Sequence, residues 1–271
     1  MHSNAATTDP LTIADVAAAL GKLACRFDID VVDHCDSTNA RLLARAENGA
    51  PSGSVLVARE QTAGRGRRGR AWLSAPGDSL TFSLLWRYSE ATSLAGLSLA
   101  VGVALARALE QLPLVGLSLK WPNDLLLGEG KLAGVLIEVV PAQTHVQAQS
   151  VVIGIGVNLH LPAAMPADLR VRSAALAMAA TPLPAASHLL ARLLVQLHSV
   201  LSDFAAGGFA PLRPEWLRRH AFDQRRIQLL SDFAVPLVGI CRGVDEDGAL
   251  LLETQAGTQR VISGDISLRG A

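Results

Sequence analysis

The sequence lacks most of the features that mark secreted, metal-binding or strongly charged proteins. Its 271 residues include only three cysteines, Cys25, Cys35 and Cys241, which are scattered along the chain. Isolated cysteines supply neither a disulfide framework nor the paired spacing of a zinc site, and they are typical of a reducing cytoplasm. Lysine plus arginine and aspartate plus glutamate both number 24, so the formal net charge is zero. No overall field therefore favours nucleic acid or a membrane surface as a partner.

Long apolar runs and a targeting segment are also missing. Residues 91–106 carry no charge, but this run is shorter than the roughly 18–20 apolar residues of a membrane span, and Arg107 follows directly. A helix that is apolar on every side is typical of a protein core, so the segment is predicted to be a buried helix. Residues 1–10 are polar and do not resemble a signal peptide. A cytoplasmic protein without a membrane partner is therefore expected.

What the sequence does contain is a succession of short strands and a few helices. Half of the residues are hydrophobic, which is enough for a sizeable core. Periodicity and cap residues predict helices at 11–23, 40–46, 91–106, 187–206 and 214–219, and strands at 54–58, 80–86, 117–121, 124–127, 132–140 and 150–158. Because short turns join consecutive strands, antiparallel or mixed pairing is expected rather than a run of βαβ units.

The character of the chain changes near residue 222. Further short strands are predicted at 227–230, 235–241, 249–253 and 260–262, with a hairpin signal at Asp247-Gly248. A run of short alternating strands of this kind is typical of a small β-barrel. The chain is therefore predicted to be an α+β protein with a small C-terminal β domain.

The densest group of unusual residues is the segment Gly64–Arg70, here named the arginine loop, with four arginines and three glycines. Glycine lets backbone N–H groups turn toward an anion, and guanidinium groups match carboxylates and phosphates. The loop therefore favours a site that holds two anions close together. A solvated basic turn and a nucleic-acid contact are the alternatives that the loop alone leaves open.

A second group of polar residues lies where a strand is broken by Pro122. Lys120, Asn123 and Asp124 fall within five residues, and a tight turn at 128–130 returns the chain to Lys131. A single lysine at a strand end is usually a surface charge. Here the hairpin is expected to direct two lysines and one carboxylate toward the same place.

Five short motifs occur in the order and approximate spacing of one known family. They are Asp36–Asn39, Gly64–Gly69, Lys120–Asp124, Lys131–Gly134 and Gly154–Asn158. On these motifs, and on Arg242–Asp245 and Gly264–Arg269, the chain resembles the bacterial biotin protein ligases. The resemblance implies a tail and short helix at 1–24, a class II synthetase-like catalytic domain with a mixed, largely antiparallel sheet at 25–221, and an SH3-like β-barrel at 222–271.

The resemblance also implies a reaction in two steps. Biotin is activated by ATP and Mg²⁺ as biotinyl-5′-AMP, and the biotinyl group is then transferred to a lysine of a biotin carboxyl carrier protein, the carrier subunit of a biotin-dependent carboxylase. A monomer or weak homodimer is expected. Some relatives carry an N-terminal operator-binding module, but only 35 residues precede Asp36. A ligase without repressor function or sequence-specific DNA binding is therefore expected.

Candidate site residues are carried over from the matching motifs. For biotin the resemblance implies Ser37, Thr38, Asn39, Gln61, Gly64, Arg65, Gly66, Arg67 and Lys131. For ATP or the adenylate it implies Arg67, Arg68, Trp72, Lys120, Asn123, Asp124, Lys131 and Asn158. The implied catalytic residues are Lys131, Arg65 and Arg67, and the implied Mg²⁺ ligand is Asp124.

Several of these assignments have competing interpretations. Ser37 and Thr38 are also good helix caps, and both roles can coexist. Residues 168–174, where some relatives stack a tryptophan on adenine, contain no aromatic residue, so Arg170 or aliphatic side chains would have to serve. A lipoate or octanoate ligase is the main alternative function, and the polar Ser37, Thr38 and Gln61 favour biotin over an alkyl chain. A nucleic-acid-binding module is a third alternative, which the zero net charge disfavours.

Overall fold

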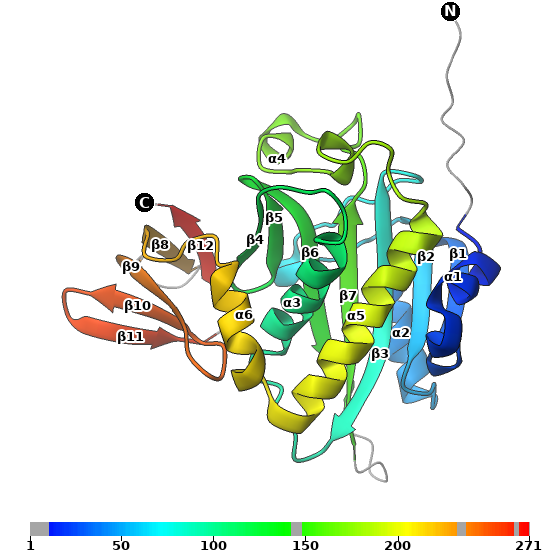
Figure 1. The fold of residues 1–271 in the computed structure, drawn as a ribbon, viewed down its shortest axis with the longest axis horizontal. Helices are drawn as coiled ribbons and strands as arrows, with labels where there is room; N and C mark the ends of the chain where they lie inside the picture. Colours follow the sequence, from blue (N-terminus) through cyan, green and yellow to red (C-terminus); the bar gives the residue numbers. More distant parts are fainter. Residues whose placement is uncertain (1–10, 142–147, 232–236, 263–265, 271) are drawn as a thin grey trace, which may run out of the picture.

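The computed structural model of the protein describes residues 11–141, 148–231, 237–262 and 266–270. In these ranges the chain forms two sheets, the larger with seven strands in the order β1-β2-β3-β7-β6-β5-β4 (Figure 1). Its strands are β1 (Asp28–Cys35), β2 (Ser54–Gln61), β3 (Ser79–Ser89), β4 (Leu117–Lys120), β5 (Asp124–Leu127), β6 (Gly130–Val139) and β7 (Ala148–Asn158). β1 is parallel to β2, whereas the other pairs are antiparallel, which confirms the predicted mixed sheet.

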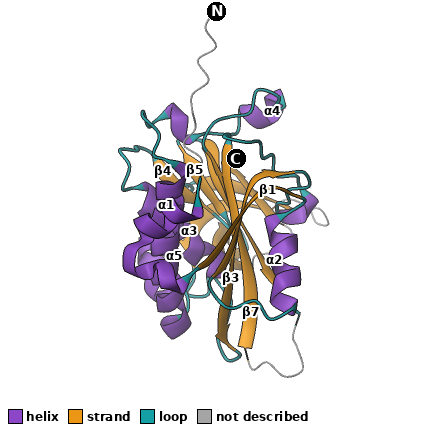
Figure 2. Cartoon of the chain, turned by 90° about the vertical axis from the view of Figure 1, so that its right-hand side faces the viewer, coloured by secondary structure: helices purple, strands orange, loops and turns teal. Residues whose placement is uncertain are grey.

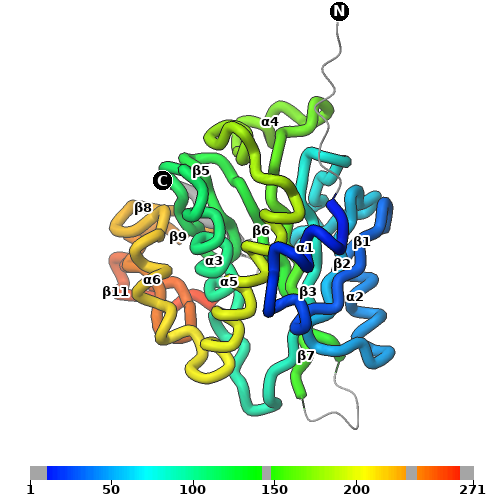
Figure 3. Tube along the Cα trace, turned by 45° about the vertical axis from the view of Figure 1, so that its right-hand side comes forward, coloured from blue at the N-terminus to red at the C-terminus, as the bar shows by residue number. Residues whose placement is uncertain are grey.

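Helices cover both faces of this sheet. α1 (Ile13–Leu20), α3 (Leu97–Leu109) and α5 (Ala186–Gly207) lie on one face, and α2 (Thr38–Glu47) lies on the other (Figure 2). Figure 3 shows α1 beside α5, although they are far apart in the sequence. The main core fills the space between the sheet and the three helices, and a smaller apolar cluster lies beneath α2. The remaining helical segments are η1 (Gly21–Arg26), η2 (Arg67–Gly69), α4 (Ala167–Arg170), η3 (Leu176–Met178), η4 (Ala210–Leu212) and α6 (Arg213–Arg218).

Two long apolar helices, α5 and α3, are core helices. α5 is long and apolar enough, by length and composition, to cross a membrane, but its residues from Ser187 to Phe204 include ten buried side chains. Packing against α3 and α1 accounts for this apolar face. The predicted buried helix at 91–106 is confirmed as α3, but it begins at Leu97. Gly96 has φ +76°, and a Cβ there would lie 2.6 Å from the Cβ of Phe209, so the chain turns sharply before the helix can start.

Five C-terminal strands form a second, antiparallel sheet in the order β11-β10-β9-β8-β12. Its strands are β8 (Arg226–Ser231), β9 (Leu237–Val244), β10 (Leu250–Thr254), β11 (Gly257–Val261) and β12 (Ile266–Gly270). The predicted small β domain is thus confirmed, whereas its closure into a barrel and the boundaries at 24 and 221 stay predictions. Two strands escaped prediction, β1 and β12. In β1 acidic residues interrupt the apolar alternation because the strand lies at the sheet edge.

The turn between β9 and β10 packs directly onto the larger domain. The buried indole of Trp121 donates its Nε1–H to the carbonyl of Gly248 over 3.0 Å. Arg213 Nε donates to the carbonyl of Val244 over 2.6 Å. Gly248 has φ +79°, and a Cβ there would lie 2.8 Å from the Cα of Gly96. The two sheets are therefore joined by close backbone contact, beside the strand break at Pro122.

His220 lies at this junction and makes stability depend on pH. The residue is 8% exposed, and its ring centre lies 4.5 Å from that of Trp216 with the ring planes tilted by 37°. Its Nε2 lies 3.9 Å from the Sγ of Cys241. Burial lowers the pKa of His220 from 6.5 to about 4, against a small opposing effect of Asp223. The unfolded chain therefore binds a proton that the folded protein excludes as pH falls from 6.5 toward 4, and stability is lost across that window.

We expect the free energy of unfolding to fall by about 2 kcal/mol between roughly pH 7 and pH 5 because of His220 alone. Urea unfolding of the wild type and of His220→Gln at these two pH values would measure this share. The variant should be less stable at neutral pH, and it should lose less stability on acidification. Equal pH dependence in both proteins would show that His220 is not the group responsible.

Candidate active site

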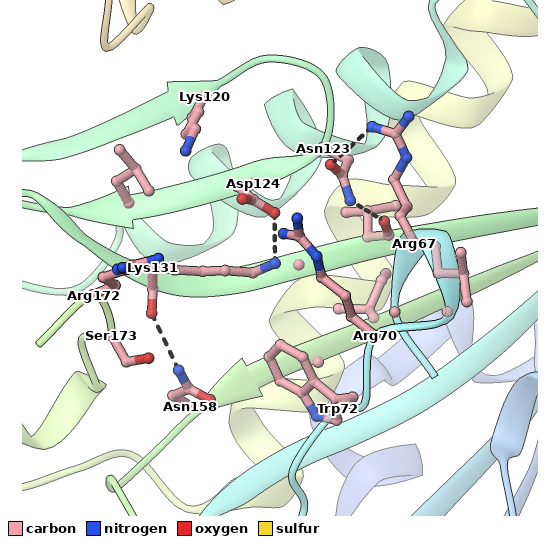
Figure 4. Close-up of a pocket in the computed structure, with 18 of the residues that line it drawn as sticks. Arg67, Arg70, Trp72, Lys120, Asn123, Asp124, Lys131, Asn158, Arg172 and Ser173 are labelled. Atoms are coloured by element: carbon pink, nitrogen blue, oxygen red, sulfur yellow. Dashed lines mark hydrogen bonds and ion pairs between the residues drawn. The ribbon is translucent and has the colours of Figure 1, made fainter. Parts of the chain in front are cut away.

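A single cavity of about 770 Å³ collects residues from α2, the arginine loop and strands β4 to β7 (Figure 4). Of all the candidate site residues predicted from the sequence, only Gly64 is absent from its lining. Segments more than one hundred residues apart in the chain, such as Ser37 and Asn158, therefore meet at one place. The sequence prediction that these motifs form one site is consistent with this arrangement.

One end of the cavity is neutral and rich in hydrogen-bonding groups. Ser37 caps α2, because its Oγ accepts from the backbone N–H of Ala40 over 3.4 Å, so the capping interpretation holds while the residue also lines the cavity. The backbone N–H of Thr38 donates to Gln61 Oε1 over 2.7 Å. Ser37, Thr38 and Gln61 are all at most 9% exposed. This end therefore offers fixed donors and acceptors to a small polar ring.

The arginine loop closes on itself at the rim of the cavity. The N–H of Gly66 donates to the carbonyl of Arg70 over 2.7 Å, and the N–H of Trp72 donates to the carbonyl of Gly64 over 2.9 Å. Gly64 is required here because a Cβ would lie 2.5 Å from the carbonyl oxygen of Trp72. This explains its place in the motif although it does not line the cavity. Arg68 adopts φ +61° within the same turn.

Two loop arginines reach toward neighbouring strands. Arg67 Nη1 donates to Asn123 Oδ1 over 3.3 Å, while Asn123 Nδ2 donates to the carbonyl of Val135 over 2.7 Å. Arg65 Nη2 lies 3.8 Å from Glu138 Oε1. Through Asn123 the arginine loop is connected to the strand break at Pro122. Arg67 therefore adds positive charge beside the strand break, whereas Arg65 lies near Glu138, a residue that also contacts Asn39.

Alternating glycines make a flat floor on the α2 face of the sheet. A Cβ at Gly156 would lie 2.3 Å from the ring of Trp72, and a Cβ at Gly134 would lie 2.9 Å from the Nζ of Lys131. On the next row, a Cβ at Gly154 would lie 2.2 Å from Asn39 Oδ1. The glycines at 154 and 156 therefore make room for side chains of this chain, and Trp72 lies on the floor.

Lys131 projects into the middle of the cavity. Its Nζ lies 2.6 Å from Asp124 Oδ1 and 5.8 Å from the ring centre of Trp72 (Figure 4). β5 and β6 pair as the predicted hairpin, which places Asp124 opposite Gly134 and brings Lys131 beside it. Lys120 Nζ lies 5.9 Å from the ring centre of Phe222, nearer the second sheet. The two lysines thus serve different parts of the cationic end.

Asn158 has a bracing role that the sequence did not reveal. Its Nδ2 donates to the carbonyl of Lys131 over 3.1 Å and to that of Ala174 over 3.0 Å. The N–H of Lys131 in turn donates to the carbonyl of Arg172 over 2.8 Å. Asn158 therefore fixes the backbone of Lys131 and of the loop beside it, while its side chain also lines the cavity.

Sequence reasoning missed several residues of the lining. They include Arg70, Arg172, Ser173, Phe222 and Arg225, together with Gly134, Gly154 and Gly156. In the segment 168–174, Leu169 lines the cavity, whereas Arg170 donates to the carbonyl of Pro162 instead. Arg242 bonds Glu253 and Gln224 and does not line the cavity. Only the clustering of basic residues near 170 and 225 was available as a signal in the sequence.

The side chains present do not form a metal site of their own. In the part of the chain that the structure describes, no three His, Cys, Asp or Glu side chains are grouped as metal ligands. Asp124, the predicted Mg²⁺ ligand, is paired with Lys131. A divalent cation in this cavity would take most of its oxygen ligands from phosphates and water.

Comparison with known proteins finds similarity to biotin protein ligases along nearly the whole chain. Residues 31–158 match the biotin/lipoate A/B protein ligase family, and residues 225–269 match the biotin protein ligase C terminal domain. The bifunctional ligase/repressor BirA of Escherichia coli is 36% identical over 264 residues, which cover 97% of this chain and 80% of that protein. The biotin–[acetyl-CoA-carboxylase] ligase of Paracoccus denitrificans is 36% identical over 87% of this chain and 98% of its own.

Solved structures agree with the sequence comparison. A biotin protein ligase from Aquifex aeolicus in complex with biotin and ATP matches with a TM-score of 0.78 and 30% identity, covering 90% of this chain and 99% of that one. This protein thus has the two domains that the family models describe, and one cavity gathers the motif residues. The chain belongs to the biotin protein ligase family.

Proposed function

We propose that this protein activates biotin with ATP as biotinyl-5′-AMP and transfers the biotinyl group to a specific lysine of a biotin carboxyl carrier protein. The single observation that carries the proposal is the cavity's two unlike ends. A neutral end built from Ser37, Thr38 and Gln61 fits the cyclic urea of biotin, and a cationic end around Lys131 fits a carboxylate beside phosphates. Family membership, and relatives named as biotin ligases, favour biotin over lipoate.

The first step joins two anions, and the cationic end counters their repulsion. A carboxylate oxygen attacks the α-phosphorus, an oxygen–phosphorus bond forms, and pyrophosphate leaves with the electron pair of the broken bond. Two unit charges at about 4 Å repel by about 4 kcal/mol at an effective dielectric of about 20. Arg65 and Arg67 hold the two anions together. Lys131 leaves its ion pair with Asp124 and contacts the phosphate oxygen on which negative charge builds up in the transition state.

The second step needs access rather than further charge. The ε-amine of the carrier lysine attacks the carbonyl carbon of the adenylate, an amide bond forms, AMP leaves and the amine loses a proton. A closed arginine loop shields the mixed anhydride from water until the carrier arrives. A cytoplasmic protein, a monomer or weak homodimer without sequence-specific DNA binding, stays the expectation.

The nucleotide is proposed to occupy the cationic end as its Mg²⁺ complex. Lys120, Arg68 and Asn123 contact the phosphates in this assignment, Trp72 contacts the adenylate, and Asn158 braces the backbone of Lys131. Asp124 supplies at most one ligand to the metal. Chelation of Mg²⁺ by EDTA is therefore expected to abolish turnover and to leave biotin binding intact. Calorimetry with and without EDTA would measure the biotin affinity.

Exchange of labelled pyrophosphate into ATP tests the first step directly. Reactions with biotin, lipoate, octanoate or no acid should give exchange with biotin alone. Transfer to a purified carrier protein, followed by mass spectrometry, tests the second. Exchange with lipoate or octanoate instead would move the protein to the related ligases. Folded protein that exchanges with none of the acids would overturn the proposal.

A further inference from the structure

Behind the neutral end of the cavity lies a line of polar side chains, here named the polar row, which are buried except for the partly exposed Glu138. It consists of Gln61, Thr38, Ser83, Asn39 and Glu138, in that order of contact. The row spans α2 and strands β2, β3 and β6, and Ser83 is fully buried. The first two members and Asn39 line the cavity, whereas Ser83 and Glu138 do not.

Both ends of the polar row are fixed by groups with only one hydrogen-bonding role. The backbone N–H of Thr38 can only donate, so the Gln61 atom 2.7 Å away is the oxygen Oε1. An ionised carboxylate can only accept, so the Asn39 atom 2.8 Å from Glu138 Oε2 is the nitrogen Nδ2. The carbonyl of Leu136, at 3.3 Å, is a second and longer acceptor for that nitrogen. Asn39 therefore turns its oxygen toward Ser83.

The two hydroxyl protons in the middle then have a single arrangement. Ser83 Oγ lies 2.6 Å from Asn39 Oδ1 and 2.7 Å from Thr38 Oγ1. Because Asn39 Oδ1 cannot donate, the one proton of Ser83 goes to it. This draws the Ser83 proton away from Thr38. The Thr38 hydroxyl itself donates to Gln61 Oε1 over 3.1 Å, beside the Thr38 backbone N–H.

This arrangement decides what the cavity offers to a ligand. With its own proton directed to Gln61 and the Ser83 proton directed to Asn39, the Thr38 hydroxyl is left as an acceptor. With its oxygen held by the Thr38 N–H, Gln61 is left with its amide nitrogen as a donor. A cyclic urea has N–H groups for the first and a carbonyl for the second. An alkyl or disulfide ring has neither, and it would leave these buried groups unpaired.

We propose that Glu138 is a positioning residue that sets the donor and acceptor pattern of the neutral end, and that it thereby selects a ring with adjacent N–H and C=O groups. The inference rests on the proposed function and deepens it. Glu138 acts through Asn39 and Ser83 without touching the ligand. Its other oxygen lies 3.8 Å from Arg65 Nη2, so the same carboxylate also faces the arginine loop.

Biotin affinity of four proteins tests this, by calorimetry on the wild type, Glu138→Gln, Ser83→Ala and the double variant. A glutamine can donate or accept, so it no longer fixes the Asn39 amide. Ser83→Ala breaks the row at a residue that does not touch the arginine loop. Each change is expected to weaken biotin binding by about tenfold to a hundredfold. Because both substitutions break the same polar row, the double variant should have about the same biotin affinity as the single variant that binds biotin more weakly.

Two measurements distinguish an effect of the polar row on biotin binding from a general loss of folding or stability. Glu253→Gln removes an exposed carboxylate that also pairs with an arginine, Arg242, and it should leave biotin affinity unchanged. ATP affinity and the melting temperature should change little in Glu138→Gln, since the nucleotide lies at the other end. Additive losses in the double variant, or unchanged biotin affinity in Glu138→Gln, would overturn the inference. Wild-type protein that binds no biotin would instead overturn the proposed function.

Discussion

Replacing Lys131 by methionine is expected to slow biotin-dependent pyrophosphate exchange by about a hundredfold to a thousandfold, with a much smaller loss of biotin affinity. Methionine keeps an unbranched side chain over Trp72, but it removes the charge that lies 2.6 Å from Asp124. The charge is needed most when the acyl–phosphate bond forms, so its loss is felt in the transition state rather than in the ground state. Single-turnover adenylate formation and equilibrium biotin binding measure the two effects separately.

The chain contains a matched control for this experiment. It has only three lysines, and Lys22, in η1, is exposed and does not line the cavity. Lys22→Met should therefore leave both rate and affinity unchanged. Equal losses of rate and of biotin affinity in Lys131→Met would remove Lys131 from the transition state and make it a simple binding residue.

Gly156→Ala is expected to have the second largest effect. The added methyl group would lie 2.3 Å from two carbons of the Trp72 ring. The ring cannot retreat freely, because its Nε1 donates to Thr81 Oγ1 over 3.3 Å and Lys131 lies over it. Either the strand shifts or the ring enters the cavity, so we expect a loss of about 1–3 kcal/mol of stability, together with weaker ligand binding. Urea unfolding and calorimetry would measure both.

A compensating change identifies the cause. Trp72→Leu in the Gly156→Ala background removes the ring that the methyl group meets, so the stability lost in the single variant should return in part. Binding should stay impaired, because Trp72 itself lines the cavity. If the two changes destabilised the protein additively, contact between residues 72 and 156 would not be the reason.

The sequence was sufficient for the hairpin with its turn at 128–130 and for fourteen of the residues that line the cavity. Asp124 and Lys131 could be placed together because a tight turn and strand pairing leave little freedom between them. The roles of Gly134, Gly154 and Gly156 could not be read, since a glycine in a strand does not say which side chain will occupy the space beside it. The period of two along β7 was the available clue, because glycine and asparagine face the cavity while isoleucine and valine face the core.

Longer-range contacts were beyond reach for a different reason. β1 carries acidic residues that mask its alternation, and its place at the edge, beside β2, depends on the whole sheet. Glu138 gave no signal because its partners, Asn39 and Arg65, lie far away in the chain. The contributions of Phe222 and Arg225 to the cavity follow from how the second sheet packs, which no local pattern encodes.

The seating of the second sheet has a consequence for how the protein fails under stress. The neutral end of the cavity is formed within the larger domain. The cationic end is lined in part by Phe222 and Arg225, which lie next to the second sheet in the chain. Trp121 nearby donates a hydrogen bond to the carbonyl of Gly248 in that sheet's turn. Partial unfolding that detaches the C-terminal strands is therefore expected to disrupt the cationic end of the cavity before the neutral end. A warmed or mildly denatured molecule would still bind the vitamin after it had lost the ability to react it with ATP.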